Sequence, residues 1–354
     1  MVVPMYVTEI SPPNFKGAYC VLNQLMMTLG ILTVFVCGAL LPHELTTYSP
    51  SNCKGVEIHT IGSNWRLVAL IGAITSGVII AVAAVLPESP IYHKRFGEEE
   101  QATSFINTYW GARESTARGP RAAGNLDTLL KGSRGGGDSG QSEFGYYDLL
   151  RHAPELYNPL VFALVLMVLQ QWSGINAVNM YCAQIFQDVG LKNNDQAGMY
   201  IMAVQVFGVL LSVYLVERAG RLTLLCTSII GMASTLLVMG VFFWEKDQGR
   251  NPPELALPAT MVYMLSFAIG LGPIPWLVIN EIFPDYARGT AGSVAVLVNW
   301  ICTFLVTQFF QDMDAAMDSY GTFWFFMAMM VAGFVFVLIN GDTIDLHASR
   351  IEDR

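Results

Sequence analysis

Apolar residues gather along this chain into eight long runs, separated by more polar segments. Each run is close to the ~20 residues that a helix needs to cross the hydrocarbon core of a bilayer. The pattern therefore predicts an all-α integral membrane protein. The predicted spans are approximately Ala18–Leu41, Leu67–Leu86, Pro159–Cys182, Ala197–Val216, Leu222–Phe243, Leu255–Asn280, Gly292–Phe310 and Thr322–Ile339.

None of the eight runs contains Asp, Glu, Lys, Arg or His. An ionisable residue inside a membrane usually serves a proton relay, ion coupling or voltage sensing, so these spans offer no carrier for such mechanisms. Their polar residues are amides and hydroxyls, which suit an uncharged, hydroxyl-rich ligand. The composition agrees, with 53% hydrophobic and 13% charged residues and a mean hydropathy of +0.45.

The basic residues predict the orientation and the domain limits. If the spans alternate from a cytoplasmic amino terminus, most of the 19 Lys and Arg residues face the inside. The positive-inside rule then places both termini in the cytoplasm, and we expect a multi-pass protein of the plasma membrane. Residues 1–90 hold two spans, 91–158 form a charged, Gly- and Ser-containing cytoplasmic linker, 159–340 hold six spans and 341–354 form a cytoplasmic tail.

One polar stretch inside a span begins with Gln170-Gln171 and continues to Asn176 and Asn179. Unpaired amides in hydrocarbon are costly, so these groups need partners. Two interpretations stay open from the residues alone: hydrogen bonds that join neighbouring helices, or a water-filled binding site. Gly174 permits a local break that would turn Gln171 and Asn176 toward one cavity.

A second unusual stretch is Gly270-Leu271-Gly272-Pro273-Ile274-Pro275-Trp276. Two glycines and two prolines so close together cannot form a regular helix. A broken helix at membrane depth is tolerated beside protein or a water-filled cavity and points to a transporter binding site. Trp276 and Trp300 lie far from the charged loops, which favours a pocket over the interfacial aromatic belt.

Other kinds of chemistry have no support in the sequence. The six cysteines have no metal-ligand spacing, and Cys53 stands alone in a long loop, so neither a metal site nor a disulfide is predicted. No nucleophile–base pair or phosphate-binding loop is present. We therefore expect neither an enzyme nor a cofactor, and no nucleic-acid partner.

Several motifs, in order and at suitable spacing, resemble the facilitative glucose transporters, which are sugar porters of the major facilitator superfamily. The resemblance implies two six-helix halves around a sugar pocket, of which this chain would hold helices 5–12, a partial fold. The matching residues are Pro4-x-Tyr6-x-x-Glu9-x-x-Pro12, Pro87-Glu88-Ser89-Pro90, Gln170-Gln171-x-Ser173-Gly174-Ile175-Asn176, Val216-Glu217-Arg218-Ala219-Gly220-Arg221, Gly272-Pro273-Ile274-Pro275-Trp276 to Glu281-Ile282-Phe283-Pro284, and Asn299-Trp300.

The resemblance also implies functional residues. Amides both donate to and accept from sugar hydroxyls, and an indole offers an apolar face. The implied sugar contacts are Gln24, Gln170, Gln171, Asn176, Gln205, Trp276, Asn299 and Trp300. The implied cytoplasmic gate network consists of Glu9, Lys16, Glu88, Glu217, Arg218, Arg221, Glu281 and Arg288.

The chain departs from the family pattern at several positions. Ala268 stands where the family usually has a glutamate, and Thr303 replaces a sugar-contacting Asn. Met167-Val168-Leu169 replaces the Gln-Leu-Ser of glucose-selective members, so a preference for glucose is not supported. Other departures are Ile91, Met180, Leu222 and the segment after Asn340.

Three functions follow as hypotheses. The first is facilitative transport of a neutral hexose, glucose or fructose, across the bilayer by alternating access. The second is a chain that is inactive alone and associates, as a homo- or hetero-oligomer, with a full-length transporter. The third is a proton-coupled sugar symporter. The acidic residue that such members use lies in the family's first helix, outside this chain, so these residues do not exclude symport by a longer parent protein.

Overall fold

The computed structural model describes residues 2–12, 16–40, 45–48, 58–61, 65–95, 98–106, 108–109, 153–176, 178–179, 194–249 and 256–341. The described helices are α1 (Val2–Ile10), α2 (Lys16–Leu40), α3 (Trp65–Ala83), α4 (Pro90–Arg95), α5 (Glu99–Ile106), α9 (Ala153–Trp172), α11 (Asn194–Ala219), α12 (Arg221–Asp247), α13 (Ala256–Ile269), α14 (Ile274–Ile282) and α15 (Asp285–Asn340). Two short strands, β1 (Leu45–Tyr48) and β2 (Ile58–Ile61), pair antiparallel between α2 and α3.

The helices coincide with the apolar runs of the sequence and confirm the predicted all-α membrane fold. Among the described residues, 5 helical segments are long and apolar enough to cross a membrane, and two shorter apolar helices cover Ala69–Ala83 and Leu156–Trp172. The last two predicted spans both lie in α15, where Asp318 interrupts the helix with φ 58° and ψ 164°. The carboxyl end of the span predicted at Pro159–Cys182 lies outside the described residues.

The short β1–β2 pair was not predicted, because its four-residue strands carry no long alternating pattern. In the predicted linker, α4 and α5 are described and pack against each other, whereas residues 110–152 lie outside the description. The linker and the other domain limits stay predictions.

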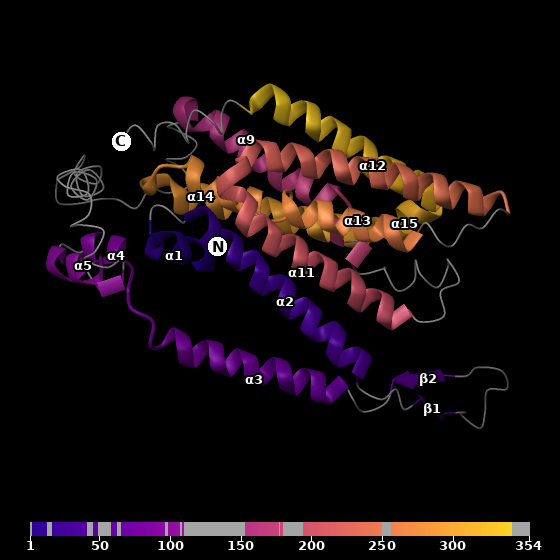
Figure 1. Cartoon of the computed structure of the whole chain (residues 1–354), viewed down its shortest axis with the longest axis horizontal. Coiled ribbons are helices and arrows are strands. Elements are labelled where there is room, and N and C mark those ends of the chain that lie inside the picture. Colours follow the sequence, from indigo (N-terminus) through magenta and orange to yellow (C-terminus); the bar gives the residue numbers. More distant parts are fainter. Residues whose placement is uncertain are drawn as a thin grey trace.

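Most of the described helices form one bundle (Figure 1). α15 packs against α9 and α12, α13 packs against α11 and α12, and α2 lies along α11. α1 touches α2 and α14 at one end of the bundle. α3 runs apart from the bundle, and its residues 69–83, with the following residues 84–86, are all exposed.

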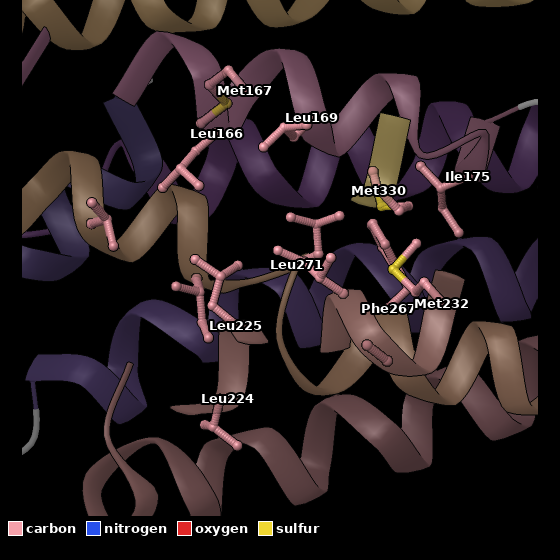
Figure 2. Packing of buried hydrophobic residues seen from close by; sticks show 14 of the residues in the cluster. Leu166, Met167, Leu169, Ile175, Leu224, Leu225, Met232, Phe267, Leu271 and Met330 are labelled. Atoms are coloured by element: carbon pink, nitrogen blue, oxygen red, sulfur yellow. The ribbon is translucent and has the colours of Figure 1, made fainter. Parts of the chain in front are cut away.

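The centre of the bundle is an apolar core to which α9, α12, α13 and α15 all contribute (Figure 2). Leu166 and Met167 of α9 and Met330 of α15 are fully buried there. Small residues allow close approach: a methyl group at Gly208 of α11 would lie 2.7 Å from the Cβ of Ala268 in α13. Membrane helices associate mainly through such packing, because lipid tails are as apolar as the core.

The predicted break at Gly174 is present. α9 ends at Trp172, Gly174 has φ +85°, and the helical conformation resumes at Ile175. A Cβ at position 174 would lie 2.8 Å from a ring carbon of Phe326 in α15. Both the left-handed backbone and the close ring therefore require glycine here.

We expect Gly174→Ala to lower the stability of the protein by about 1–2 kcal/mol or more, because an L-residue is strained in the left-handed region. The measurement is thermal unfolding of the purified chain in detergent. Gly30→Ala is the matched control, since nothing lies within 4 Å of its added Cβ on α2. Equal melting shifts for the two variants would contradict the assigned role of Gly174.

Candidate functional site

The most irregular backbone inside the bundle lies at residues 270–273, between α13 and α14. A helix broken at this depth leaves backbone groups that need partners. The hydroxyl of Ser212 in α11 donates to Ile269 O at 2.8 Å, and the amide of Leu271 donates to the hydroxyl of Ser228 in α12 at 2.9 Å. Two neighbouring helices thus satisfy groups that the break leaves free.

A third helix holds the same break through Gln170. Its Nε2 donates to Leu271 O at 3.0 Å and to Gly272 O at 2.8 Å. The side chain is only 4% exposed, so these bonds form in a water-poor environment. Gln170 therefore fixes the position of α14 relative to α9.

Four amides are connected in series, and we call them the amide chain: Asn176, Gln171, Asn299 and Gln170. Asn176 Nδ2 donates to Gln171 Oε1, Gln171 Nε2 donates to Asn299 Oδ1 at 3.0 Å, and Asn299 Nδ2 donates to Gln170 Oε1 at 2.9 Å. Gln171 is 6% and Asn299 3% exposed, whereas Asn176 is half-buried. In this conformation the amides join helices, which was one of the two open interpretations.

The turn after α9 is anchored by a buried tyrosine. Tyr263 of α13 donates its hydroxyl to Ser173 O at 2.8 Å, and Ser173 Oγ donates to Gln170 O at 2.7 Å. Tyr263, Ser212 and Ser228 were not among the residues predicted for the site. The only available signal was the need of the broken backbone for partners, which does not say which hydroxyl supplies them.

The other four predicted sugar contacts lie outside the amide chain. Gln24 on α2 and Trp276 on α14 are half-buried. Trp300 is 63% exposed, because successive helix residues point about 100° apart and its neighbour Asn299 faces inward. Gln205 is 2% exposed, and its Oε1 has no hydrogen-bond partner among the described residues.

Asn280 on α14 has similar surroundings and was also missed. Its Nδ2 donates to Trp276 O at 2.8 Å, while its Oδ1 is buried without a partner in the part of the chain that the structure describes. Leaving such an acceptor unpaired costs roughly 1–3 kcal/mol. Gln205 and Asn280 therefore each keep a buried oxygen that can accept from a hydroxyl.

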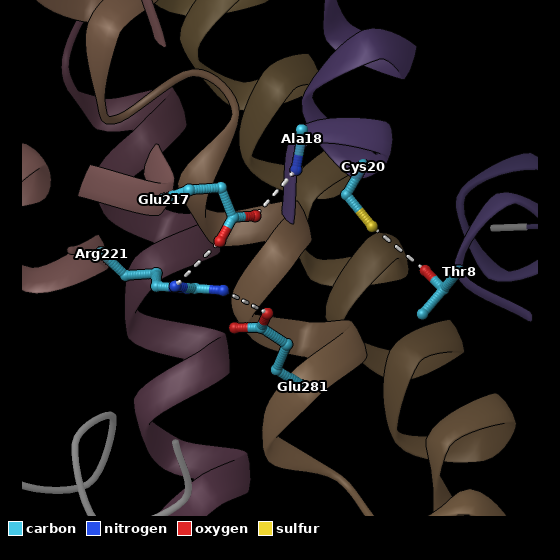
Figure 3. Close-up of polar contacts among 6 residues, drawn as sticks. All are labelled: Thr8, Ala18, Cys20, Glu217, Arg221 and Glu281. Carbon is cyan, nitrogen blue, oxygen red and sulfur yellow. Dashed lines mark hydrogen bonds and ion pairs between the residues drawn. The ribbon is translucent and has the colours of Figure 1, made fainter. Parts of the chain in front are cut away.

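Three of the predicted gate residues meet at one end of the bundle, and we call them the charged cluster: Glu217, Arg221 and Glu281 (Figure 3). Arg221 Nη2 lies 3.1 Å from Glu281 Oε1, and Nη1 lies 3.8 Å from Glu217 Oε2. Glu217 Oε1 also accepts from the backbone amide of Ala18 at 3.2 Å. A carboxylate is favourable at a helix amino terminus, so the cluster ties α2 to α11, α12 and α14.

Gly17 makes this contact sterically feasible, because a Cβ at position 17 would collide with Glu217 Oε1. Cys20 of α2 lies nearby and contacts Thr8 Oγ1 of α1 at 3.1 Å (Figure 3). The junction between α1, α2 and the rest of the bundle is thus closely packed at this end.

The remaining predicted gate residues make other contacts. Arg218 lies 4.3 Å from the ring centroid of Tyr214, and Arg288 Nη2 donates to Phe283 O at 3.3 Å. Glu9 is half-buried and Glu88 exposed. The side chain of Lys16 lies outside the description.

Close to Glu88, Tyr6 of α1 donates its hydroxyl to Pro87 O at 2.7 Å. Burial, and then the nearby Glu88 carboxylate, raise the pKa of Tyr6. The hydroxyl therefore stays protonated and remains a donor at neutral pH.

A helix bundle with a broken helix and neutral buried amides at membrane depth is the architecture of a membrane transporter. The family model described as "Sugar (and other) transporter" matches residues 1–340. The chain therefore belongs to this sugar transporter family, a family of transporters rather than enzymes.

The curated relatives include insect proteins. The chain is 35% identical over 344 residues to the "Facilitated trehalose transporter Tret1" of Drosophila erecta, covering 95% of this chain and 36% of that protein. It is 33% identical over 340 residues to the protein of the same name from Polypedilum vanderplanki, covering 95% of this chain and 61% of the relative. The chain thus spans about a third of the length of the first of these relatives and less than two thirds of the second.

Solved structures show the same fold. The proton:xylose symporter XylE bound to 6-bromo-6-deoxy-D-glucose matches with a TM-score of 0.73 at 23% identity, covering 95% of this chain and 66% of that one. A partially occluded inward-open conformation of XylE from E. coli matches with a TM-score of 0.67 at 21% identity, covering 96% and 67%. These matches confirm the predicted major facilitator superfamily fold.

We expect Ser228→Ala to destabilise the protein by roughly 1–3 kcal/mol, because the buried amide of Leu271 would lose its acceptor. The measurement is again thermal unfolding in detergent. Thr227→Ala is the control: its exposed hydroxyl donates only to the carbonyl of Thr223 in its own helix, so its loss should have little effect. If the Ser228→Ala variant unfolded at the same temperature as the control variant, this would contradict the hydrogen bond between Leu271 and Ser228.

Proposed function

We propose that this chain carries out passive transport of a neutral sugar across a membrane by alternating access. The observation that carries the proposal is the amide chain, which lies beside a broken helix and contains no charged side chain. Each amide has donors and an acceptor that match the two roles of a sugar hydroxyl. Family membership supplies the substrate class.

The substrate within that class is a neutral hexose or a disaccharide of hexoses. Glucose or fructose is the substrate predicted from the sequence, whereas the insect relatives are named as trehalose transporters. All three sugars present hydroxyls without charge, so the amides suit each of them. Glucose, fructose and trehalose are therefore the sugars to compare.

The charged cluster would act as a latch on the side that the sequence predicts to be cytoplasmic. It connects α2, from the half before the predicted linker, with α11, α12 and α14 after it. Its ion pairs are partly exposed, and such pairs contribute only about 0–1 kcal/mol each. A contact of this strength can open in every transport cycle.

A second candidate function is association with another transporter chain. The specific observation in its favour is α3, whose described side chains at residues 69–83 are all exposed. An apolar helix of this kind can be covered by lipid or by helices of another protein. Proton-coupled symport, the third hypothesis, would need an ionisable group. The amide chain contains none, and the acidic residue that the family resemblance implies lies outside this chain, so the pH dependence of uptake is the discriminating measurement.

The test is uptake of labelled glucose, fructose and trehalose into liposomes that contain the purified chain. We expect the uptake to be saturable. Unlabelled neutral sugar should inhibit it, gluconate should not inhibit it, and an imposed pH gradient should leave it unchanged. The control variant is Asn176→Leu, which removes a half-buried amide of the site and should therefore lower the uptake. Uptake driven by a proton gradient would favour symport; no uptake, with co-purification of a full-length relative, would favour association.

A separate prediction concerns the latch. Glu281→Gln removes the carboxylate that pairs with Arg221. The loss of this partly exposed ion pair should increase the fraction of protein with an open latch by about two- to fivefold. The readout is the rate at which a permeant maleimide alkylates Cys20, a buried cysteine next to the cluster whose Sγ contacts Thr8 Oγ1. Glu245→Gln, at the other end of α12, is the control and should leave the rate unchanged. Equal rates in both variants would count against the latch.

A further inference from the structure

We propose that the membrane face of the bundle holds a binding site for the acyl chain of a phospholipid, in a groove between α12 and α15. The groove has a volume of about 320 Å³ and is formed by side chains from residues 229–237 of α12 and 327–334 of α15. None of its lining residues belongs to the amide chain or to the charged cluster. The inference therefore does not depend on the proposed function.

The groove stays open because the two helices are in close contact on either side of it. Towards one end, the ring of Phe243 in α12 stacks on that of Phe323 in α15, with the centroids 5.2 Å apart. At the other end, a Cβ at Gly341, directly after α15, would lie 3.0 Å from Leu222 Cδ1 of α12. These contacts fix the distance between two antiparallel helices, so the stretch between them cannot close.

Small side chains on α12 leave the space in the middle of this helix pair. Ala233 and Ser234 line the groove there. It also touches Ile229 and Met330, which are 1% and 0% exposed, so it reaches the apolar core. The walls of an empty gap lose the dispersion contacts that they would otherwise make. An occupant that fills the groove is therefore favoured.

The lining selects an apolar occupant. Ser234 is the one polar residue that lines the groove in the part of the chain that the structure describes. Its hydroxyl already donates to Gly231 O of its own helix at 2.9 Å. A sugar placed here would leave most of its hydroxyls without a partner, which is costly in apolar surroundings.

The groove opens towards the lipid at the depth of the acyl chains. Ile230 and Val331 line it and are 52% and 51% exposed. At about 1.5 Å per residue, residue 229 lies about 12 Å from Arg221 at the beginning of α12, and residue 237 lies about 15 Å from Asp247 at its end. The hydrocarbon core of a bilayer is about 30 Å thick, so the groove lies near its middle.

The width of the groove fits a single acyl chain. Residues 229 and 237 are about 12 Å apart along the helix. Over that length, the volume of about 320 Å³ corresponds to a mean width of about 6 Å. A helix with its side chains is about 10–12 Å wide. The groove therefore admits an extended acyl chain but not a helix of another protein.

A bound acyl chain would also support the packing of α15 on α9. Gly333 lies on α15 within the stretch that forms the groove, and a Cβ there would lie 2.5 Å from Leu169 Cδ2 of α9. The groove and α9 thus border the same stretch of α15. We expect the bound chain to stabilise the folded protein, because a ligand that binds only the folded state does so.

Photo-crosslinking in liposomes tests the site. The chain is reconstituted in phosphatidylcholine that includes a phosphatidylcholine with a diazirine at the end of one acyl chain, and labelled residues are identified by mass spectrometry. We expect residues 229–237 and 327–334 to carry more label than Ile74 and Val78 of α3, although these two are 58% and 56% exposed. Label no heavier in the groove than on α3 would overturn the proposal, because ordinary lipid contact would explain it.

Filling the groove should remove this label. Ala233→Leu places a larger side chain in the groove, whereas the matched control, Ala332→Leu, places the same side chain at an exposed position of α15 that does not line it. We expect the first variant to lose most of the groove label and the second to keep it. Ser234→Leu, at an exposed position of α12, repeats the test if Ala233→Leu does not fold. Groove label that the filling variants retain would overturn the proposal.

Thermal unfolding in detergent gives a second readout, and neither readout depends on sugar transport. Added phosphatidylcholine should raise the melting temperature of the unaltered chain and of Ala332→Leu, and it should have little effect on Ala233→Leu. Two results would identify a different occupant and overturn the acyl-chain site. One is a sterol that displaces the phosphatidylcholine label from the groove, and the other is a dimer of this chain that the filling variants dissociate.

Discussion

The structure depends on one requirement: backbone groups freed by a broken helix must be paired inside the membrane. The carbonyls of Leu271 and Gly272 meet this requirement through Gln170, and neighbouring groups do so through Ser212 and Ser228. Each unpaired group would cost several kcal/mol, roughly 2–7 by transfer estimates. The positions of α9, α11 and α12 around the break follow from these bonds.

Much of the fold was predictable because its signals are local. Long uncharged apolar runs define the spans, Gly174 marks the end of α9, and the glycines and prolines at 270–275 mark the broken helix. Each feature follows from the residues within a few positions, through propensity or sterics. The β1–β2 pair was not predicted, because strands of four residues are too short to show a clear alternating pattern in the sequence.

The site was predictable only in part. Sequence reasoning named Gln170, Gln171, Asn176 and Asn299, but it did not predict that they bond in series, because each partner belongs to another span. Tyr263 and Asn280 were missed for the same reason. In a membrane protein the sequence shows which polar side chains lie within the spans, whereas the three-dimensional packing of the helices decides which of them form hydrogen bonds with each other.

α3 differs from the other long helices because it presents apolar side chains around its whole circumference. A helix with no preferred face gains nothing by turning one side toward a neighbour, so packing does not fix its rotation about its own axis. Among the described residues, α3 makes a small contact with α2, and just beyond its carboxyl end the hydroxyl of Tyr6 donates to the carbonyl of Pro87. Because so little packing fixes α3 within the described residues, we expect the thickness of the surrounding lipid to influence its tilt.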